Sequence, residues 1–277
     1  MERNVPLIIT ATPNICWLRP EVPYPQTSED MGEEARLCRE AGAAILHLHA
    51  ENWPADIAAI RSKSDIIVQC GMSSQLIPDR MDIFREHGDM ISIITSHHDE
   101  AFAEVDTHAL HPREELEEYA KLSAEYGVKL EFETWHTGGI WNLEYLIGKK
   151  LLDPPYFTSL FFGWPGGSWS PPTVEEYFYR RRHLPEGSLA TVSIMDERQV
   201  DILAAAIVAG DHIRVGTEDY PFNRKGAVSQ AHELVAEAVE LATALGRVVA
   251  TPTQAREIIF PKAQDHTTSA PVTLALR

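Results

Sequence analysis

The chain is poor in cysteine and has no long apolar run. Cys16, Cys38 and Cys70 lie far apart and show none of the short spacings of a metal site. Their low number excludes a disulfide scaffold, so we expect reduced, buried thiols and a cytoplasmic protein. No stretch approaches the ~20 apolar residues that cross a bilayer, and the charged start of the chain is not typical of a secretory signal.

Positive charge is also scarce, because 24 basic residues stand against 41 acidic ones and give a net charge of −17. An acidic surface repels the phosphates of nucleic acids and of anionic lipids. We therefore expect neither a nucleic acid nor a membrane as a partner. One basic run, Arg180-Arg181-Arg182-His183, lies near the end of a predicted helix and is typical of a favourable helix-end cluster.

Short apolar and β-branched runs alternate eight times with longer amphipathic segments, which predicts eight strand–helix units. The predicted strands are 7–12, 44–50, 65–71, 90–95, 129–134, 157–163, 189–195 and 212–217. The predicted helices are 28–40, 54–63, 78–86, 112–125, 141–149, 173–183, 197–209 and 227–245.

This alternation implies parallel strands joined by crossover helices. Eight such units in 277 residues predict an α/β fold, a (β/α)8 TIM barrel, as a single domain over residues 1–277 with an irregular tail from about residue 261. An open, doubly wound sheet is the alternative. It is disfavoured because Ala11-Thr12-Pro13-Asn14 follows the first strand in place of a glycine-rich turn.

The second predicted strand ends in His47-Leu48-His49, at the carboxyl end where such barrels gather their active sites. Side chains alternate along a strand, so both imidazoles can point into the barrel while Leu48 faces the helices. Two convergent imidazoles are typical of a site for zinc or a similar divalent ion. Hydrogen-bonded structural histidines are the alternative, but two buried imidazoles would then each need partners.

The eighth predicted strand carries Arg214 and ends in Glu218-Asp219. Glu218 can complete a set of two histidines and one carboxylate that leaves open positions for a substrate. Asp219 could pair with Arg214, because a buried arginine needs a partner; a solvated pair of acids in a loop is the alternative. His97 and His98, after the fourth strand, are rival ligands, of which at most one can face the site.

Two carboxylates, Glu131 and Glu133, alternate to one face of the fifth predicted strand. Buried carboxylates are costly unless they meet a metal, an arginine or a polar group of a substrate. Glu133 lies nearer the catalytic end and is predicted to contact the substrate, whereas Glu131 is a deeper structural partner. The hydroxyls of Ser73 and Thr95, near the ends of the third and fourth strands, could orient a carboxylate or a carbonyl group.

A glycine pair, Gly166-Gly167, lies in the loop after the sixth strand and before a helix. Glycines let backbone N–H groups approach a ligand, which suits an anionic group, although such turns are common. Trp164 and Trp169 beside them could line a pocket or cover the barrel mouth.

Taken together, these motifs resemble the beta-keto acid cleavage enzyme family. The resemblance is carried by residues 9–11, 41–49, 166–167, 214–219 and 246–252. It implies a homotetrameric TIM barrel in which His47, His49 and Glu218 bind Zn²⁺. It also implies that Arg214 and Asp219 form a dyad that takes a proton from the substrate.

The resemblance further implies substrate contacts and a co-substrate. The implied substrate contacts are Asn14, Ser73, Thr95, Glu133, Gly166 and Gly167. A beta-keto acid would react with acetyl-CoA to give acetoacetate and a new CoA thioester.

The chain departs from the family's pattern around the site. Ala50-Glu51-Asn52 follows the two histidines where the family has an Arg-Asp pair, Asn14 stands near an acidic position, and Tyr220 follows Glu218-Asp219 in place of asparagine. A Gly-x-Gly-Arg turn after the seventh strand is replaced by Ile194-Met195-Asp196-Glu197. These changes predict an altered substrate pocket and weaker handling of CoA. A CoA-independent metal-dependent aldolase or hydrolase, and a barrel that binds a metal or ligand without catalysis, are the alternatives.

Overall fold

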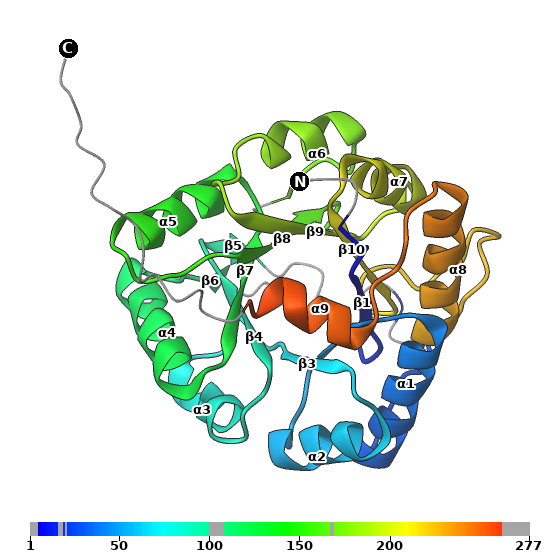
Figure 1. Ribbon diagram of the computed structural model, residues 1–277, viewed down its shortest axis with the longest axis horizontal. Coiled ribbons are helices and arrows are strands. Elements are labelled where there is room, and N and C mark those ends of the chain that lie inside the picture. Colours follow the sequence, from blue (N-terminus) through cyan, green and yellow to red (C-terminus); the bar gives the residue numbers. More distant parts are fainter. Residues whose placement is uncertain (1–4, 16–18, 20, 100–107, 167–168, 262–277) are drawn as a thin grey trace.

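Eight parallel strands close into a barrel in a computed structural model that describes residues 5–15, 19, 21–99, 108–166 and 169–261 (Figure 1). The strands are hydrogen-bonded in the ring order β1-β10-β9-β8-β7-β4-β3-β2. Their bounds are β1 Ile9–Thr12, β2 Ile45–Leu48, β3 Ile67–Cys70, β4 Met90–Ile94, β7 Lys129–Thr134, β8 Tyr156–Phe162, β9 Ser188–Ile194 and β10 His212–Gly216. The predicted TIM barrel is confirmed.

Helices surround this ring and follow the barrel strands along the chain (Figure 1). They are α1 Ser28–Ala41, α2 Trp53–Lys63, α3 Ile77–Arg85, α4 Arg113–Tyr126, α5 Thr137–Gly148, α6 Val174–Arg181, α7 Gln199–Ala209 and α8 Ala231–Ala244. None of the helices in the described part of the chain is long and apolar enough to cross a membrane.

Two helix starts differ from the sequence prediction. Helix α5 begins at Thr137 rather than at residue 141, because His136 caps it by accepting a hydrogen bond from the backbone N–H of Gly138. Its first turn contains two glycines, which have a low helix propensity, so the sequence pattern does not predict a helix there. Helix α8 begins at Ala231 rather than at residue 227, because Val228 instead forms a β-bridge with Phe222.

The side chains of each strand point alternately toward the helices and into the barrel, and this divides the apolar core into two parts. Leu46 and Leu48 of β2, and their counterparts on the other strands, belong to the large apolar cluster that includes the helices. Ile45 of β2 belongs to a second cluster inside the barrel, with Ile67 and Phe157. The period of two along each strand therefore separates the helix-facing core from the barrel interior.

A ninth helix, α9 Pro252–Ile259, closes the barrel at the end opposite the carboxyl ends of the strands (Figure 1). Ala255 and Ile259 of α9 are fully buried against Ile8 and Ile45. Each of the three buried isoleucines contributes ~1.5–3 kcal/mol to stability. The apolar layer seals one end, so ligands can enter only from the other.

The next layer of the barrel interior is polar. Gln69, Ser92, Glu131, Ser159 and Thr191 are all buried there. Ser159 donates a hydrogen bond to the carboxylate of Glu131, which fits the structural role predicted for this residue. Polar side chains thus fill the barrel from its middle to its mouth, and they surround the site described below.

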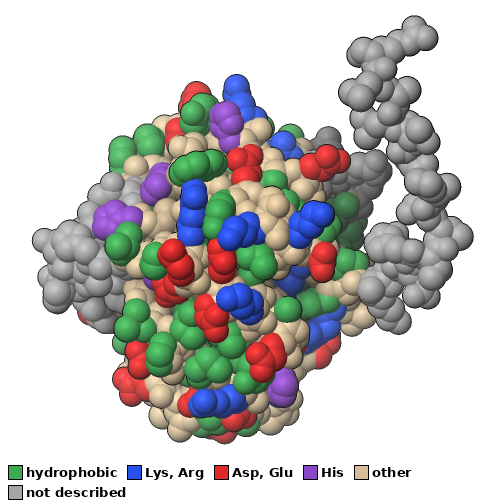
Figure 2. All heavy atoms as spheres, turned by 90° about the vertical axis from the view of Figure 1, so that its left-hand side faces the viewer, with side chains coloured by type: hydrophobic (Ala, Val, Ile, Leu, Met, Phe, Trp, Pro, Cys, Tyr) green, Lys and Arg blue, Asp and Glu red, His purple; other side chains and the backbone are tan. Residues whose placement is uncertain are grey.

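Arg180 does not behave as the helix-end surface charge that the sequence suggested. Its side chain is fully buried and donates to the backbone carbonyls of Thr134 and Phe161, at 2.6 Å for the latter. It therefore ties α6 to the carboxyl ends of β7 and β8. On the face over α4 and α5, acidic and basic side chains are interspersed (Figure 2), so the acidic excess is not gathered there into one patch.

Two of the three cysteines, Cys38 and Cys70, are buried and unpaired, as predicted. Cys16 lies outside the described residues, and so does the tail predicted from about residue 261, apart from its first residue. A short antiparallel pair, β5 His98–Asp99 and β6 His108–Ala109, lies outside the barrel sheet and was not predicted.

We expect Glu131→Gln to stabilise the protein at high pH. Burial, and then the neighbouring carboxylate of Glu133, raise the pKa of Glu131 from 4.5 to about 8. The folded state then holds a proton that the unfolded chain releases, so stability falls as pH rises through this interval. Gln keeps an acceptor for Ser159 but cannot ionise, and the gain over the wild type should reach several kcal/mol near pH 9, since each pKa unit corresponds to about 1.4 kcal/mol.

Thermal unfolding of both proteins between about pH 5 and pH 9 measures this difference. Glu125→Gln, at an exposed position on α4, is the matched control and should shift the unfolding temperature equally at all pH values. If the gain in stability of Glu131→Gln over the wild type did not grow with pH, this would contradict a raised pKa of Glu131.

Candidate functional site

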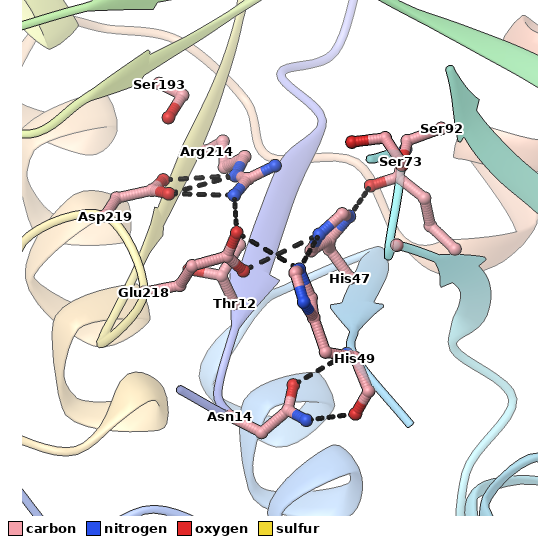
Figure 3. Close-up of polar contacts among 12 residues, drawn as sticks. Thr12, Asn14, His47, His49, Ser73, Ser92, Ser193, Arg214, Glu218 and Asp219 are labelled. Atoms are coloured by element: carbon pink, nitrogen blue, oxygen red, sulfur yellow. Dashed lines mark hydrogen bonds and ion pairs between the residues drawn. The ribbon is translucent and has the colours of Figure 1, made fainter. Parts of the chain in front are cut away.

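Three potential metal ligands converge at the barrel mouth: His47 on β2, His49 just after it, and Glu218 after β10 (Figure 3). The Nε2 atoms of the two histidines are 3.3 Å apart. The carboxylate of Glu218 lies 3.6 Å from Nε2 of His47 and 3.4 Å from Nε2 of His49. Strand β1 lies between β2 and β10 in the ring, so barrel closure brings these distant segments together. The predicted convergence is confirmed.

The orientation of the His47 ring is fixed by a buried amide. Its Nδ1 lies 3.0 Å from Oε1 of Gln69, an acceptor, so Nδ1 donates and Nε2 keeps its lone pair toward Glu218. Burial, and then Arg214, lower the pKa of His47 well below its usual range. The neutral imidazole, which is the form that binds metals, is therefore favoured. The sequence reading missed Gln69, whose only signal was an amide within an otherwise apolar strand.

The backbone of His49 is held by Asn14, which follows β1. The N–H of His49 donates to Oδ1 of Asn14 at 3.0 Å, and the amide of Asn14 donates to the carbonyl of His49 (Figure 3). Asn14, expected to contact the substrate, thus first secures a potential metal ligand.

Gly71, which follows β3, packs against both imidazoles. A Cβ at this position would lie 2.8 Å from the His49 ring and 2.9 Å from Nε2 of His47. The residue is fixed on two sides, because its N–H donates to Leu48 at 2.8 Å and its carbonyl accepts from the fully buried Arg80 at 2.7 Å. Only glycine leaves enough space for the two imidazole rings, because any side chain at this position would clash with both. No pattern in the sequence indicates this contact.

Glu218 supplies the third potential ligand through a buried oxygen. Its Oε1 accepts from Nη2 of Arg214 at 2.6 Å, whereas the buried Oε2 has no hydrogen-bond partner among the described residues. Burial opposes ionisation of Glu218, but Arg214 and the two histidines outweigh it and lower the pKa. An ionised carboxylate oxygen facing two imidazole rings is a donor set that fits a divalent cation.

Arg214 also binds Asp219, so the predicted pairing is confirmed. Nε of Arg214 lies 3.1 and 3.2 Å from the two carboxylate oxygens, and both side chains are buried (Figure 3). Burial raises the pKa of Asp219 to about 6, although Arg214 opposes the rise. A carboxylate that titrates close to neutrality is suited to accept and return a proton.

The turn that carries these acids depends on Gly216, the last residue of β10. Its φ of 152° is one that side-chain-bearing residues rarely adopt. A Cβ there would lie 2.4 Å from the backbone oxygen of Thr12 on β1. The close crossing of β1 and β10 therefore requires glycine, and the chain then turns Glu218 and Asp219 over the barrel mouth.

A cavity of about 280 Å³ opens beside the three potential ligands. Its lining includes Arg214, Glu218, Ser73 and Glu133, and Ser73 donates to the Glu133 carboxylate at 2.9 Å. We name it the acid cavity, because two carboxylates and a guanidinium line it. Ser73 and Glu133 are therefore brought to the site.

An aromatic wall bounds the acid cavity on one side. Trp135 and Phe161 are stacked with ring centroids 4.5 Å apart, and Trp164 meets both edge-on. The sequence reading weighed Trp164 but missed Phe161 and Trp135. Trp135 could have been found, because it follows Glu133 by two residues and the alternation that points Glu133 inward therefore points Trp135 inward as well.

Other predicted site residues lie elsewhere. Thr95 does not line the acid cavity, and its hydroxyl donates to the backbone carbonyl of Glu133 at 2.9 Å. Gly166 lies in the loop after β8 and accepts from the N–H of Trp169 at 3.1 Å, while Gly167 lies outside the described residues. His97, a rival ligand, is exposed and does not join the three-ligand group, and the side chain of His98 also lies outside the described part.

Comparison with known proteins gives a family match over most of the chain. The family described as beta-keto acid cleavage enzyme matches residues 6–260. The 3-keto-5-aminohexanoate cleavage enzyme of Fusobacterium nucleatum is 31% identical over 92% of this chain and 98% of its own. The 3,5-dioxohexanoate:acetyl-CoA acetone transferase of Paraburkholderia graminis is 22% identical over 94% of this chain and 97% of its own.

A solved structure supports the fold alone. The apo structure of ObcA superimposes with a TM-score of 0.72 at 16% sequence identity. The match covers 85% of this chain and 65% of the ObcA chain.

We expect the double variant His47→Ala/His49→Ala to lose stoichiometric divalent metal, because two of the three ligand atoms are removed. Elemental analysis of the purified protein measures the content. His97→Ala/His98→Ala removes the rival pair and is the matched control, which should keep the metal. Unchanged content in the first variant, or loss in the second, would show that the ion binds elsewhere.

We also expect Gly71→Ala to weaken metal binding about tenfold or more, since the added methyl group displaces both imidazoles. A titration with Zn²⁺ against a chromogenic chelator measures the affinity. Gly148→Ala is the control, because a Cβ there meets nothing within 4 Å. Equal affinities in the two variants would argue against the contact.

Proposed function

We propose that this chain, which belongs to the beta-keto acid cleavage enzyme family, cleaves a beta-keto acid with acetyl-CoA as second substrate. The products would be acetoacetate and the CoA thioester of the remaining acyl group. The observation that carries the proposal is the buried Arg214–Asp219 pair directly beside the three-ligand group, with Arg214 only 2.6 Å from Glu218. The name of the Paraburkholderia graminis relative supports acetyl-CoA as the second substrate.

Zn²⁺ is the proposed metal, and His47, His49 and Glu218 would hold it. A bound divalent cation would polarise the keto group of the substrate and stabilise the negative charge that develops on its oxygen. The two-histidine, one-carboxylate set leaves a coordination position open for this purpose.

Asp219 is the proposed base. Its carboxylate accepts a proton from the carbon between the ketone and the carboxylate of the keto acid, while Arg214 fixes its position through Nε. That carbon then forms a bond to the acetyl carbon, and the CoA thiolate leaves. The thiolate attacks the original keto carbon, the bond from this carbon to the former methylene breaks, and Asp219 returns the proton to acetoacetate.

Ser73 and Glu133 are the proposed substrate contacts in the acid cavity, because both line it. Asn14 is proposed to act on the substrate mainly through His49, whose backbone it binds. Thr95, Gly166 and Gly167 stay predictions as substrate contacts. A homotetramer and a cytoplasmic location, both inferred from the sequence, belong to the same proposal, and light scattering on the purified protein tests the tetramer.

A CoA-independent aldolase or hydrolase on the same barrel is the second candidate. One observation favours it: acidic Glu51 follows the metal-ligand segment and, with Asp56, lines a second cavity at the site. Carboxylates there disfavour the phosphates of CoA. Turnover of a keto acid without any thioester would select this candidate.

We expect Asp219→Asn to lower kcat about a thousandfold while metal content stays at the wild-type level, because the base is lost and the three ligands remain. Acetoacetate formation from a panel of keto acids with acetyl-CoA and Zn²⁺ measures the rate. Asp201→Asn, at an exposed position on α7, is the control and should keep the rate. A rate for Asp219→Asn within about tenfold of the wild type would exclude Asp219 as the base.

A further inference from the structure

The three-ligand group opens onto a second cavity, larger than the acid cavity. This cavity has a volume of about 610 Å³ and shares His49 and Met72 with the acid cavity. We name it the acceptor cavity. Asn14, Tyr24, Thr27, Glu51, Asn52 and Asp56 are among the residues that line it. The acid cavity carries Ser73, Glu133 and Arg214, and the acceptor cavity offers a second substrate a separate way to the same centre.

The charge of the acceptor cavity is wrong for phosphate groups. Its described lining includes two acids, Glu51 and Asp56, and neither a lysine nor an arginine. Glu51 is exposed and Asp56 is half-buried, so the repulsion between these carboxylates and a phosphate is weakened by solvent and salt but keeps its sign. The nucleotide of CoA carries several negative phosphate charges, so the described lining offers it no electrostatic attraction.

The N-termini of two helices at this cavity would otherwise attract anions, but residues of this chain already satisfy their N–H groups and offset their partial positive charge. Helices α1 and α2 begin at the acceptor cavity, after the N-caps Thr27 and Asn52. Thr27 accepts from the N–H of Asp30 at 3.1 Å, and Asn52 accepts from the N–H of Ala55 at 3.2 Å. The first turns also carry acids of their own, Asp30 among them. These carboxylates occupy the favourable field that a phosphate would need.

Uncharged polar groups make up much of the remaining lining. Amide side chains and hydroxyls predominate, as in Gln26, Asn52, Tyr24 and Ser28. Such groups match the amides and hydroxyls of a pantetheine arm, which is long, flexible and uncharged. The arm ends in the thioester, which the cavity would deliver beside His49.

From these observations we propose that the acceptor cavity binds an acyl thioester through its pantetheine arm, and that the residues described in its lining give the nucleotide of CoA no recognition. This inference rests on the proposed function, because it assumes that a thioester is the second substrate. It narrows that substrate to the class of acyl pantetheine thioesters, with or without a nucleotide.

The test compares acetyl-CoA with S-acetylpantetheine, which has the same acyl group and the same arm but no nucleotide. With the holoenzyme and one keto acid, kcat/KM for S-acetylpantetheine should lie within about tenfold of the value for acetyl-CoA. An advantage of more than about a hundredfold for acetyl-CoA overturns the inference and leaves the proposed function standing. If neither thioester yields acetoacetate with any keto acid, the proposed function fails and the inference fails with it.

A charge variant tests the cavity directly. In Glu51→Gln/Asp56→Asn the repulsion is removed, so the ratio of kcat/KM for acetyl-CoA to that for S-acetylpantetheine should rise about fivefold at low salt and less at high salt. Glu86→Gln, at an exposed position after α3, is the matched control and should keep the wild-type ratio. An unchanged ratio in the double variant shows that the nucleotide lies away from these acids and overturns the proposed role of the cavity charge.

Discussion

One buried guanidinium, that of Arg214, allows two adjacent carboxylates to ionise inside the barrel. It contacts Glu218 at 2.6 Å and Asp219 at 3.1 Å, and all three side chains are nearly inaccessible to solvent. Without a cation between them, such carboxylates would take up protons rather than ionise. Arg214 thus separates their tasks, since Glu218 is held as an anion toward the histidines while Asp219 keeps a pKa near neutrality.

The histidines depend on a different kind of support, made of backbone contacts and close packing. Asn14 binds both backbone groups of His49, Gln69 orients the ring of His47, and Gly71 leaves the space that both rings occupy. Arg80 completes this support from behind the sheet by binding the carbonyl of Gly71. These side chains are held in place by rigid strands, so the proposed binding of a metal would require little further ordering.

The two cavities that meet at His49 differ in chemistry, and this difference suits a reaction between two unlike molecules. The acid cavity has a guanidinium, carboxylates and an aromatic wall, whereas the acceptor cavity has uncharged amides and hydroxyls with two acids. The proposed keto acid would need to be oriented close to Asp219, and the proposed thioester would need a channel that ends at the same place. The altered Ala50-Glu51-Asn52 segment belongs to the acceptor side, so the departure from the family pattern falls where the second substrate would lie.

Local pattern was enough to predict the barrel, the inward direction of His47 and His49, and the pairing of Arg214 with Asp219. These features depend on the period of two along a strand and on the position of a strand's carboxyl end, both of which are written in consecutive residues. Asn14, Thr95 and Arg180 could not be placed in this way. Their partners, His49, Glu133 and Thr134, come from segments 35, 38 and 46 residues away. A polar side chain bonds to whichever group ring closure sets beside it, and the space that demands glycine at position 71 exists only once β2 and β3 are paired.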